Sequence, residues 1–327
     1  MENNSFIEVK NLVTEYSSGK RTVHAVNGVS FSLKRGETLA LVGETGAGKT
    51  TIAKSILRIL PDPQGKIAGG SILFDGVDLV TISEQEMRKV RGKRISMVFQ
   101  DPMTALNPVK TVGEQIAEVV RKHELVGAKE AWSAAEKMLE TVGIPAARSS
   151  EYPHQFSGGM KQRVVIAMAL ANQPDLLLAD EPTSALDVTI QAQVLELMSD
   201  LKEKFGTSII LITHDLGIVA KECDKVAVVY AGEIVEYGEK VALFKNPSHP
   251  YTVGLFGAIP DLYSDVERLA NIEGFPPDPT DLPVGCCFSP RCKYATEECK
   301  TKKPVLSEVG PDHYCSCFRV GMDKEAL

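Results

Sequence analysis

The chain has 327 residues, of which 43% are hydrophobic and 24% are charged, and its formal net charge is −7. This length suits one large domain with additions or two domains, and the composition is typical of a globular protein. The acidic balance argues against nucleic-acid binding, and no apolar run approaches the roughly 18–20 residues that span a bilayer. The opening residues, MENNSFIEVK, lack the basic and apolar regions of a secretory signal, so we expect a cytoplasmic protein with reduced thiols.

The first third of the sequence is predicted to be β-structure with one helix. Residues 5–42 form short β-segments separated by turns, and the apolar run TLALV at 38–42 suits a buried parallel strand. A helical pattern, TIAKSILRIL, follows over 51–60 and stops at Pro61. Residues 69–99 are predicted as further strands that end in ISMVFQ.

The rest of the sequence alternates between helical and strand patterns. Residues 104–172 are predicted to be helical, and buried strands at 176–180 and 208–214 flank a helix over about 188–205. The segment KVAVVYAGEIVEYG is typical of a hairpin that turns near Gly232. After it, the Pro/Asp-rich segment FPPDPTDLP predicts a linker that leads to a cluster of cysteines. Strands that alternate with helices predict an α/β core.

A glycine-rich loop at residues 43–50, GETGAGKT, matches the pattern G-x-x-x-x-G-K-[ST] between a predicted strand and a predicted helix. Its glycines let backbone N–H groups surround phosphate oxygens, and the new helix adds its positive end. We expect Lys49 to reach the β- and γ-phosphates and the Thr50 hydroxyl to bind Mg²⁺. The predicted ATP-binding residues in the loop and directly after it are Gly43, Gly46, Gly48, Lys49, Thr50 and Thr51.

Two carboxylates follow the predicted strand at 176–180. Asp180 ends that strand, where we expect its carboxylate to hold the Mg²⁺ shell, and Glu181 is the predicted general base that orients the attacking water. A strand that ends in Asp-Glu is common for structural reasons alone. The glycine-rich loop favours the catalytic interpretation, because its chemistry requires this second site.

The segment FSGGMKQRVVIAMAL begins with a good helix cap, Ser157, followed by Gly158 and Gly159. It is either a capped amphipathic helix or a second helix end that binds phosphate. Two such ends in one chain suggest two nucleotides shared between two subunits.

Four motifs now resemble those of ATP-binding-cassette (ABC) ATPases in the same order. GETGAGKT is similar to Walker A, FSGGM with KQRVVIAMAL to the signature, and LLLADEPTSALD to Walker B and the D-loop. FQDPMTALNP, NPSHPYT and GCCFSPRC resemble more closely the ATPase subunits of bacterial dipeptide and oligopeptide importers. Phe156 and Met160 depart from the Leu and Gln of many cassettes, but the cap and both glycines are kept, so we expect phosphate contact.

The resemblance implies an α/β fold with a P-loop NTPase core of the ABC type, an N-terminal antiparallel β subdomain, a helical insertion and a small Cys-rich C-terminal module. The implied boundaries are 5–103 and 173–250 for the core with its β subdomain, 104–172 for the helical signature subdomain and 251–327 for the C-terminal extension.

The resemblance also implies roles for single residues. Tyr16 would stack on adenine, His214 would be the switch histidine at the γ-phosphate, and Gln100 would be the Q-loop residue near Mg²⁺ and the attacking water. Asp187 would communicate across the dimer, and QDPMTALNP would receive a coupling helix, unless it is an ordinary loop. The implied catalytic residues are Glu181, His214 and Gln100; the implied magnesium ligands are Thr50, Gln100 and Asp180; and Ser157, Gly158 and Gly159 would act in trans on the partner's ATP.

Six of the seven cysteines lie between residues 286 and 317, and three interpretations compete for them. A reducing compartment disfavours disulfides, and structural zinc usually has a tight C-x₂₋₄-C pair, whereas four loosely spaced thiolates also suit a [4Fe–4S] cluster. The resemblance implies such a cluster and leaves Cys287 and Cys315 spare, while Cys223 is expected to be a buried apolar residue. The implied cluster ligands are Cys286, Cys292, Cys299 and Cys317.

The implied function is the ATP-hydrolysing subunit of a dipeptide or oligopeptide importer, with ATP and Mg²⁺ as cofactors. It would lie at the cytoplasmic face of the membrane and would not bind nucleic acid. The implied partners are a second ATPase subunit in a heterodimer, two transmembrane permease subunits and, indirectly, an extracytoplasmic peptide-binding protein. Two alternatives stay open: the same motor with another cargo, such as nickel or sugars, and a soluble non-transport ABC protein, although such proteins usually carry two cassettes or a long coiled-coil insertion.

Overall fold

A computed structural model describes residues 5–19, 21–184, 186–257 and 272–320 of the chain. The chain folds into two compact units. Unit 1 comprises residues 1–33, 39–80 and 213–327, and unit 2 comprises residues 34–38 and 81–212. In the described ranges, no helix has the length and apolar character needed to cross a bilayer.

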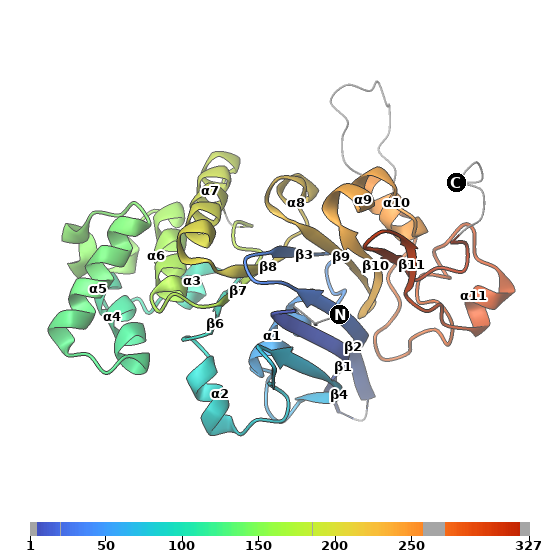
Figure 1. Cartoon of the computed structure of the whole chain (residues 1–327), viewed down its shortest axis with the longest axis horizontal. Coiled ribbons are helices and arrows are strands. Elements are labelled where there is room, and N and C mark those ends of the chain that lie inside the picture. The colour runs from blue at the N-terminus through green and yellow to red at the C-terminus, as the bar shows by residue number, and fades with distance from the viewer. Residues whose placement is uncertain (1–4, 20, 185, 258–271, 321–327) are drawn as a thin grey trace. The chain divides into compact units, whose positions relative to one another are not determined.

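Unit 1 contains a four-stranded antiparallel sheet in the order β2-β1-β4-β5 (Figure 1). Its long strands bury apolar side chains such as Leu12 and Val29, as expected for a sheet with one covered face. The strands are β1 (Ile7–Ser18), β2 (Arg21–Leu33), β4 (Gly65–Phe74) and β5 (Val77–Asp78).

A second, mixed sheet in unit 1 has the order β11-β12-β10-β9-β3. Its strands are β3 (Thr38–Val42), β9 (Lys225–Tyr230), β10 (Glu233–Glu239), β11 (Ser307–Gly310) and β12 (His313–Cys315). Strand β3 is fully buried and pairs in parallel with β9, as its apolar run predicts. The predicted hairpin is confirmed: β9 and β10 turn at Ala231 and Gly232, whose φ angles of 47° and 78° suit a two-residue hairpin turn.

The C-terminal segment is attached to this mixed sheet. Strand β12 pairs antiparallel with β10, with Cys315 opposite Glu236. A separate Cys-rich module is therefore not confirmed, because the described part of the segment extends the sheet of the core. The helices of unit 1 are α1 (Lys49–Leu57), α8 (Leu216–Glu222), α9 (Lys240–Lys245), α10 (Pro250–Gly257) and α11 (Glu297–Thr301).

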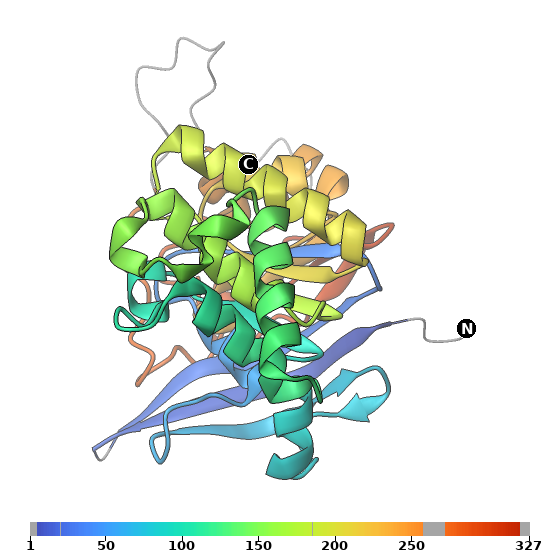
Figure 2. The ribbon, with the colours of Figure 1, turned by 90° about the vertical axis from the view of Figure 1, so that its left-hand side faces the viewer.

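Unit 2 combines three parallel strands, in the order β8-β7-β6, with helices that are coloured from cyan to yellow in Figure 2. The strands are β6 (Ile95–Val98), β7 (Leu176–Asp180) and β8 (Ser208–Ile212). The helices are α2 (Glu84–Val90), α3 (Pro102–Ala105), α4 (Val112–His123), α5 (Ala128–Thr141), α6 (Gly158–Leu170) and α7 (Val188–Phe205), with 3₁₀ turns η1 (Ala146–Ser150) and η2 (Pro153–Gln155). Helix α7 has the predicted bounds.

Two element predictions need correction. Helix α2 lies within residues 69–99, for which the sequence pattern predicts only strands. Its start is fixed by a capping box, in which Ser83 accepts from the Glu86 N–H and the Glu86 carboxylate accepts from the Ser83 N–H. Helix α1 ends at Leu57 and not near Pro61, because Arg58 adopts a left-handed conformation at φ 50°.

Candidate nucleotide site and cysteine pocket

The glycine-rich loop leads from β3 into α1 and lies tightly against its neighbours in unit 1. Gly43 has a φ of 149°, and a Cβ there would lie 2.1 Å from the carbonyl oxygen of Val229. Gly48 has a φ of 103°, and a Cβ there would lie 2.4 Å from the carbonyl oxygen of Ala25. The loop backbone lies directly against β9 and β2, and for this reason only glycine fits at both positions.

Lys49 is enclosed by its own loop. Its side chain is buried, and Nζ donates to the carbonyl oxygens of Gly43 at 2.8 Å and of Glu44 at 2.9 Å. Helix α1 begins at the same residue, so a cation and the positive end of a helix occur together. This is the chemistry that suits phosphate oxygens.

Tyr16 lies beside the start of α1. Its hydroxyl donates to Oγ1 of Thr51 at 3.3 Å, and its ring is half-buried. Unit 1 therefore brings the predicted adenine-stacking residue to a predicted ATP-binding residue. His214 is exposed, and the preceding Thr213 N–H donates to the carbonyl oxygen of Leu41 in β3 at 3.4 Å. The contacts of Tyr16 and His214 with a nucleotide stay predictions.

Unit 2 brings together Gln100 and Glu181, which are 81 residues apart in the chain. Nε2 of Gln100 donates to Oε2 of Glu181 at 3.0 Å. Asp180 ends β7 and is only 4% exposed. Glu181 has a φ of 45°, a left-handed conformation that costs a non-glycine residue energy and occurs often at functional sites.

The signature and D-loop residues cap two helices of unit 2. Oγ of Ser157 accepts from the Met160 N–H at 3.4 Å at the start of α6, and Oδ1 of Asp187 accepts from the Ile190 N–H at 3.0 Å at the start of α7. A Cβ on Gly159 would lie 2.5 Å from Cγ2 of Ile190, so this glycine is also needed for packing within the chain. The action of Ser157, Gly158 and Gly159 in trans stays a prediction.

Two residues next to the glycine-rich loop were not predicted as part of the site. The Tyr251 hydroxyl accepts from the Glu44 N–H at 2.9 Å, and the Arg291 guanidinium pairs with the Glu44 carboxylate. Both lie in segments, NPSHPYT and GCCFSPRC, that served only to identify the family resemblance. No local pattern links them to residues more than 200 positions earlier.

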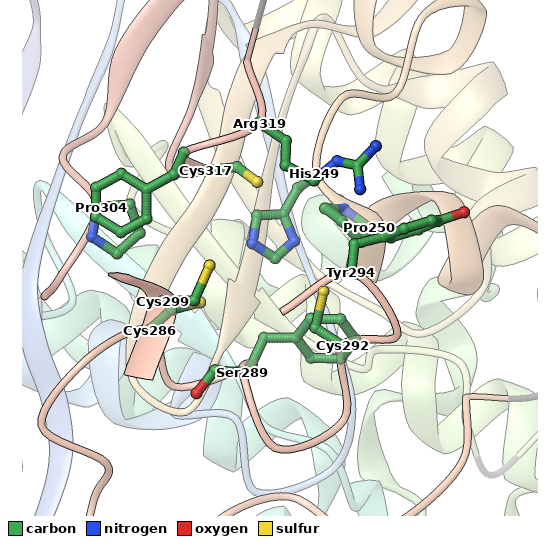
Figure 3. A pocket seen from close by; sticks show the side chains of 12 residues that line it. His249, Pro250, Cys286, Ser289, Cys292, Tyr294, Cys299, Pro304, Cys317 and Arg319 are labelled. Carbon is green, nitrogen blue, oxygen red and sulfur yellow. The ribbon is translucent and has the colours of Figure 1, made fainter. Parts of the chain in front are cut away.

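The four predicted cluster ligands line one pocket in unit 1, and Figure 3 shows their sulfur atoms around it. Cys286 and Cys292 come from one turn, Cys299 from α11, and Cys317 from the residues after β12. His249 and Phe288 also line the pocket. Cys287 and Cys315 are buried and are not among its lining residues.

Burial dominates the electrostatics of these thiols. It raises the pKa of Cys286 to about 11, with further contributions from Cys317, Cys299 and Cys292, so this thiol is protonated at neutral pH. Burial also raises the pKa of Cys292 and Cys317, and each of these interacts with Cys299. A bound cation would have to displace thiol protons.

No three His, Cys, Asp or Glu side chains in the described ranges are arranged to hold a metal ion. The iron–sulfur and zinc predictions therefore stay predictions. The pocket does gather the predicted ligand set and leaves out the two cysteines expected to be spare.

The sequence of the chain matches two protein families and the sequences of several known proteins. Residues 26–184 match the family described as "ABC transporter", and residues 235–299 match "Oligopeptide/dipeptide transporter, C-terminal region". The chain is 52% identical to the oligopeptide transport ATP-binding protein OppD of Bacillus subtilis (strain 168), over 97% of this chain and 89% of that protein. It is 50% identical to a probable peptide ABC transporter ATP-binding protein of Sinorhizobium fredii, over 96% of this chain and 94% of that protein.

A solved structure supports the same fold. A dimeric ATP-binding cassette in a post-hydrolysis state, bound to ADP and Pi, superposes with a TM-score of 0.64 at 27% identity, over 72% of this chain and 98% of that one. The predicted cassette fold with its antiparallel β subdomain is confirmed.

Proposed function

Because the chain belongs to the family of ABC transporter ATPase subunits with an oligopeptide/dipeptide transporter C-terminal region, we propose that its ATP hydrolysis powers the import of dipeptides or oligopeptides. Its working partners are two membrane permease subunits, a second ATPase subunit in a heterodimer and, indirectly, an extracytoplasmic peptide-binding protein. The chain works at the cytoplasmic face of the membrane.

The Gln100–Glu181 hydrogen bond is the observation that carries the hydrolytic part of this proposal. A carboxylate held by a neighbouring amide is oriented to accept a proton from an attacking water. The glycine-rich loop and Lys49 bind the triphosphate, Tyr16 stacks on the base, and His214 contacts the γ-phosphate. In the dimer, Ser157, Gly158 and Gly159 of one subunit complete the ATP site of the other, and Asp187 links the two sites.

The proposed magnesium ligands are the Thr50 hydroxyl, the Gln100 amide oxygen and the Asp180 carboxylate. Hard oxygen donors suit Mg²⁺, and the burial of Asp180 at the end of an apolar strand supports a role for its charge. When bound, Mg²⁺ neutralises charge on the phosphate oxygens.

Transport of peptides can be tested with the chain assembled with its membrane subunits and binding protein in liposomes. We expect di- or oligopeptides to stimulate ATP hydrolysis and to accumulate in the lumen, whereas nickel and sugars do neither. Stimulation by nickel or a sugar instead of peptides would show that the chain powers the import of a different substrate. Hydrolysis unaffected by any of them, with ribosomes or DNA bound to the chain, would favour the non-transport alternative.

We also propose a [4Fe–4S] cluster in the cysteine pocket. Four cysteines line the pocket, which fits the Cys₄ ligand set of such a cluster. Each iron of a cluster takes its own thiolate, so the sulfur atoms need not converge on one point as they must around zinc. Cysteines of the turn 286–292, of helix α11 and of the residues after β12 would hold the cluster.

Anaerobically purified protein is accordingly expected to be brown and to contain about four iron atoms per chain. Cys292→Ser should lose the colour and most of the iron. Cys287→Ser, which changes the neighbour of a ligand, should keep both. If the wild-type protein is colourless and contains stoichiometric zinc, the pocket binds zinc and not an iron–sulfur cluster.

A further inference from the structure

Glu44 places a negative charge inside the proposed phosphate-binding loop. It is the second residue of GETGAGKT, and its own carbonyl oxygen accepts from Nζ of Lys49 at 2.9 Å. A carboxylate at this position repels a triphosphate unless a cation neutralises it. The loop therefore needs a partner for Glu44 that does not compete with Lys49.

Arg291 is that partner. Its Nη1 donates to Oε2 of Glu44 at 2.8 Å and its Nη2 to Oε1 at 3.1 Å, a bidentate pair between residues 247 positions apart. The Arg291 side chain is only 5% exposed, whereas the Glu44 side chain is 27% exposed. Charge-assisted, bidentate pairs of this kind are among the stronger and more directional hydrogen bonds in proteins.

The position of Arg291 is set by residues outside the loop. Nε donates to the carbonyl oxygen of Glu273 at 3.0 Å, Nη2 to that of Ile272 at 3.2 Å, and Nη1 to the Tyr230 hydroxyl at 3.3 Å. The guanidinium also lies 5.7 Å from the centre of the Tyr230 ring. The arginine side chain is thus held by residues of the C-terminal segment and of β9 in addition to Glu44.

A compact turn connects this arginine to the cysteine pocket. The Arg291 N–H donates to the Phe288 carbonyl oxygen at 3.0 Å, and the Ser289 N–H donates to that of Cys286 at 2.9 Å. Cys286 and Cys292 line the pocket, and the Phe288 ring packs edge-on against Tyr230 at 5.2 Å. One turn therefore contacts both the pocket and the loop.

We propose that Arg291 is a positioning residue for ATP: it clamps and neutralises Glu44, so that the C-terminal segment sets the affinity of the glycine-rich loop for nucleotide. This inference rests on the proposed nucleotide site and concerns a residue that touches the loop and not the substrate.

The test is a titration of the full chain with Mg²⁺ and a fluorescent ATP analogue. Arg291→Ala is expected to raise the Kd about tenfold and to raise KM for ATP with little change in kcat. Glu44→Gln alone should bind at least as tightly as wild type, because it removes a carboxylate and leaves the Arg291 cation beside the loop. The double variant Arg291→Ala with Glu44→Gln should return to within about threefold of wild type.

Two further variants separate the possible failures. Lys303→Ala breaks another ion pair between the C-terminal segment and the core, the one with Glu233, and should leave the Kd unchanged. Lys49→Ala should abolish binding. If it binds as wild type does, the proposed nucleotide site fails and the clamp with it. If Lys49→Ala fails to bind but folded Arg291→Ala binds normally, or the double variant is as weak as Arg291→Ala, only the clamp is overturned.

Discussion

Glu181→Gln is expected to bind ATP nearly as tightly as the wild-type chain and to hydrolyse it about 10²–10⁴-fold more slowly. Glutamine keeps the shape of the side chain and an oxygen that can accept from Nε2 of Gln100, but it cannot take a proton from water. The backbone at residue 181 keeps its φ of 45°, because the two side chains meet the same steric limits there. Single-turnover hydrolysis and equilibrium titration with ATP measure the two quantities separately.

Glu196→Gln is a matched control for the loss of one carboxylate in unit 2. Glu196 is exposed on α7, so its substitution should change neither binding nor hydrolysis. Full turnover by Glu181→Gln would show that another group activates the water. A loss of ATP affinity comparable to the loss of rate would instead give Glu181 a role in binding.

Local patterns in the sequence were sufficient to predict much of the fold and the nucleotide motifs. Helix α7 follows from an N-cap, an apolar period and a glycine at its end, all of which act within one segment. The same holds for the loop at 43–50, whose pattern is contiguous and lies between a strand and a helix. Helix α2 has a recognisable local signal too, the capping box of Ser83 and Glu86, but its seven residues include only two apolar side chains, which are too few to define a helical period.

Contacts between distant segments could not be predicted from the sequence. The pairing of Arg291 with Glu44 depends on how β9 and the C-terminal segment pack beside the loop. Both residues lie in motifs, GETGAGKT and GCCFSPRC, but no local pattern links one motif to the other. The packing requirement for a glycine at position 159 could not be predicted either, because it arises from the close approach of Ile190 on α7. Such contacts follow from tertiary packing, which a local pattern does not encode.

Gly43→Ala is expected to lower the free energy of unfolding by about 3 kcal/mol or more and to abolish tight binding of ATP. Two costs add at this position: an L-residue is strained at a φ of 149°, and its Cβ would overlap the backbone oxygen of Val229, which cannot rotate away. The loop would have to move off β9, and Nζ of Lys49, which donates to the Gly43 carbonyl oxygen, would move with it. Urea unfolding and ATP titration measure the two effects.

Gly76→Ala separates strain from overlap. Gly76 also has a positive φ, 80°, but a Cβ there would meet no atom within 4 Å. Its substitution should therefore cost only the strain of the left-handed region, about 1–2 kcal/mol, and leave ATP binding intact. If Gly43→Ala proved no more destabilising than Gly76→Ala, the loop would not lie against Val229. The shape of the phosphate site would then depend on the ligand and not on the packing of the loop against β9.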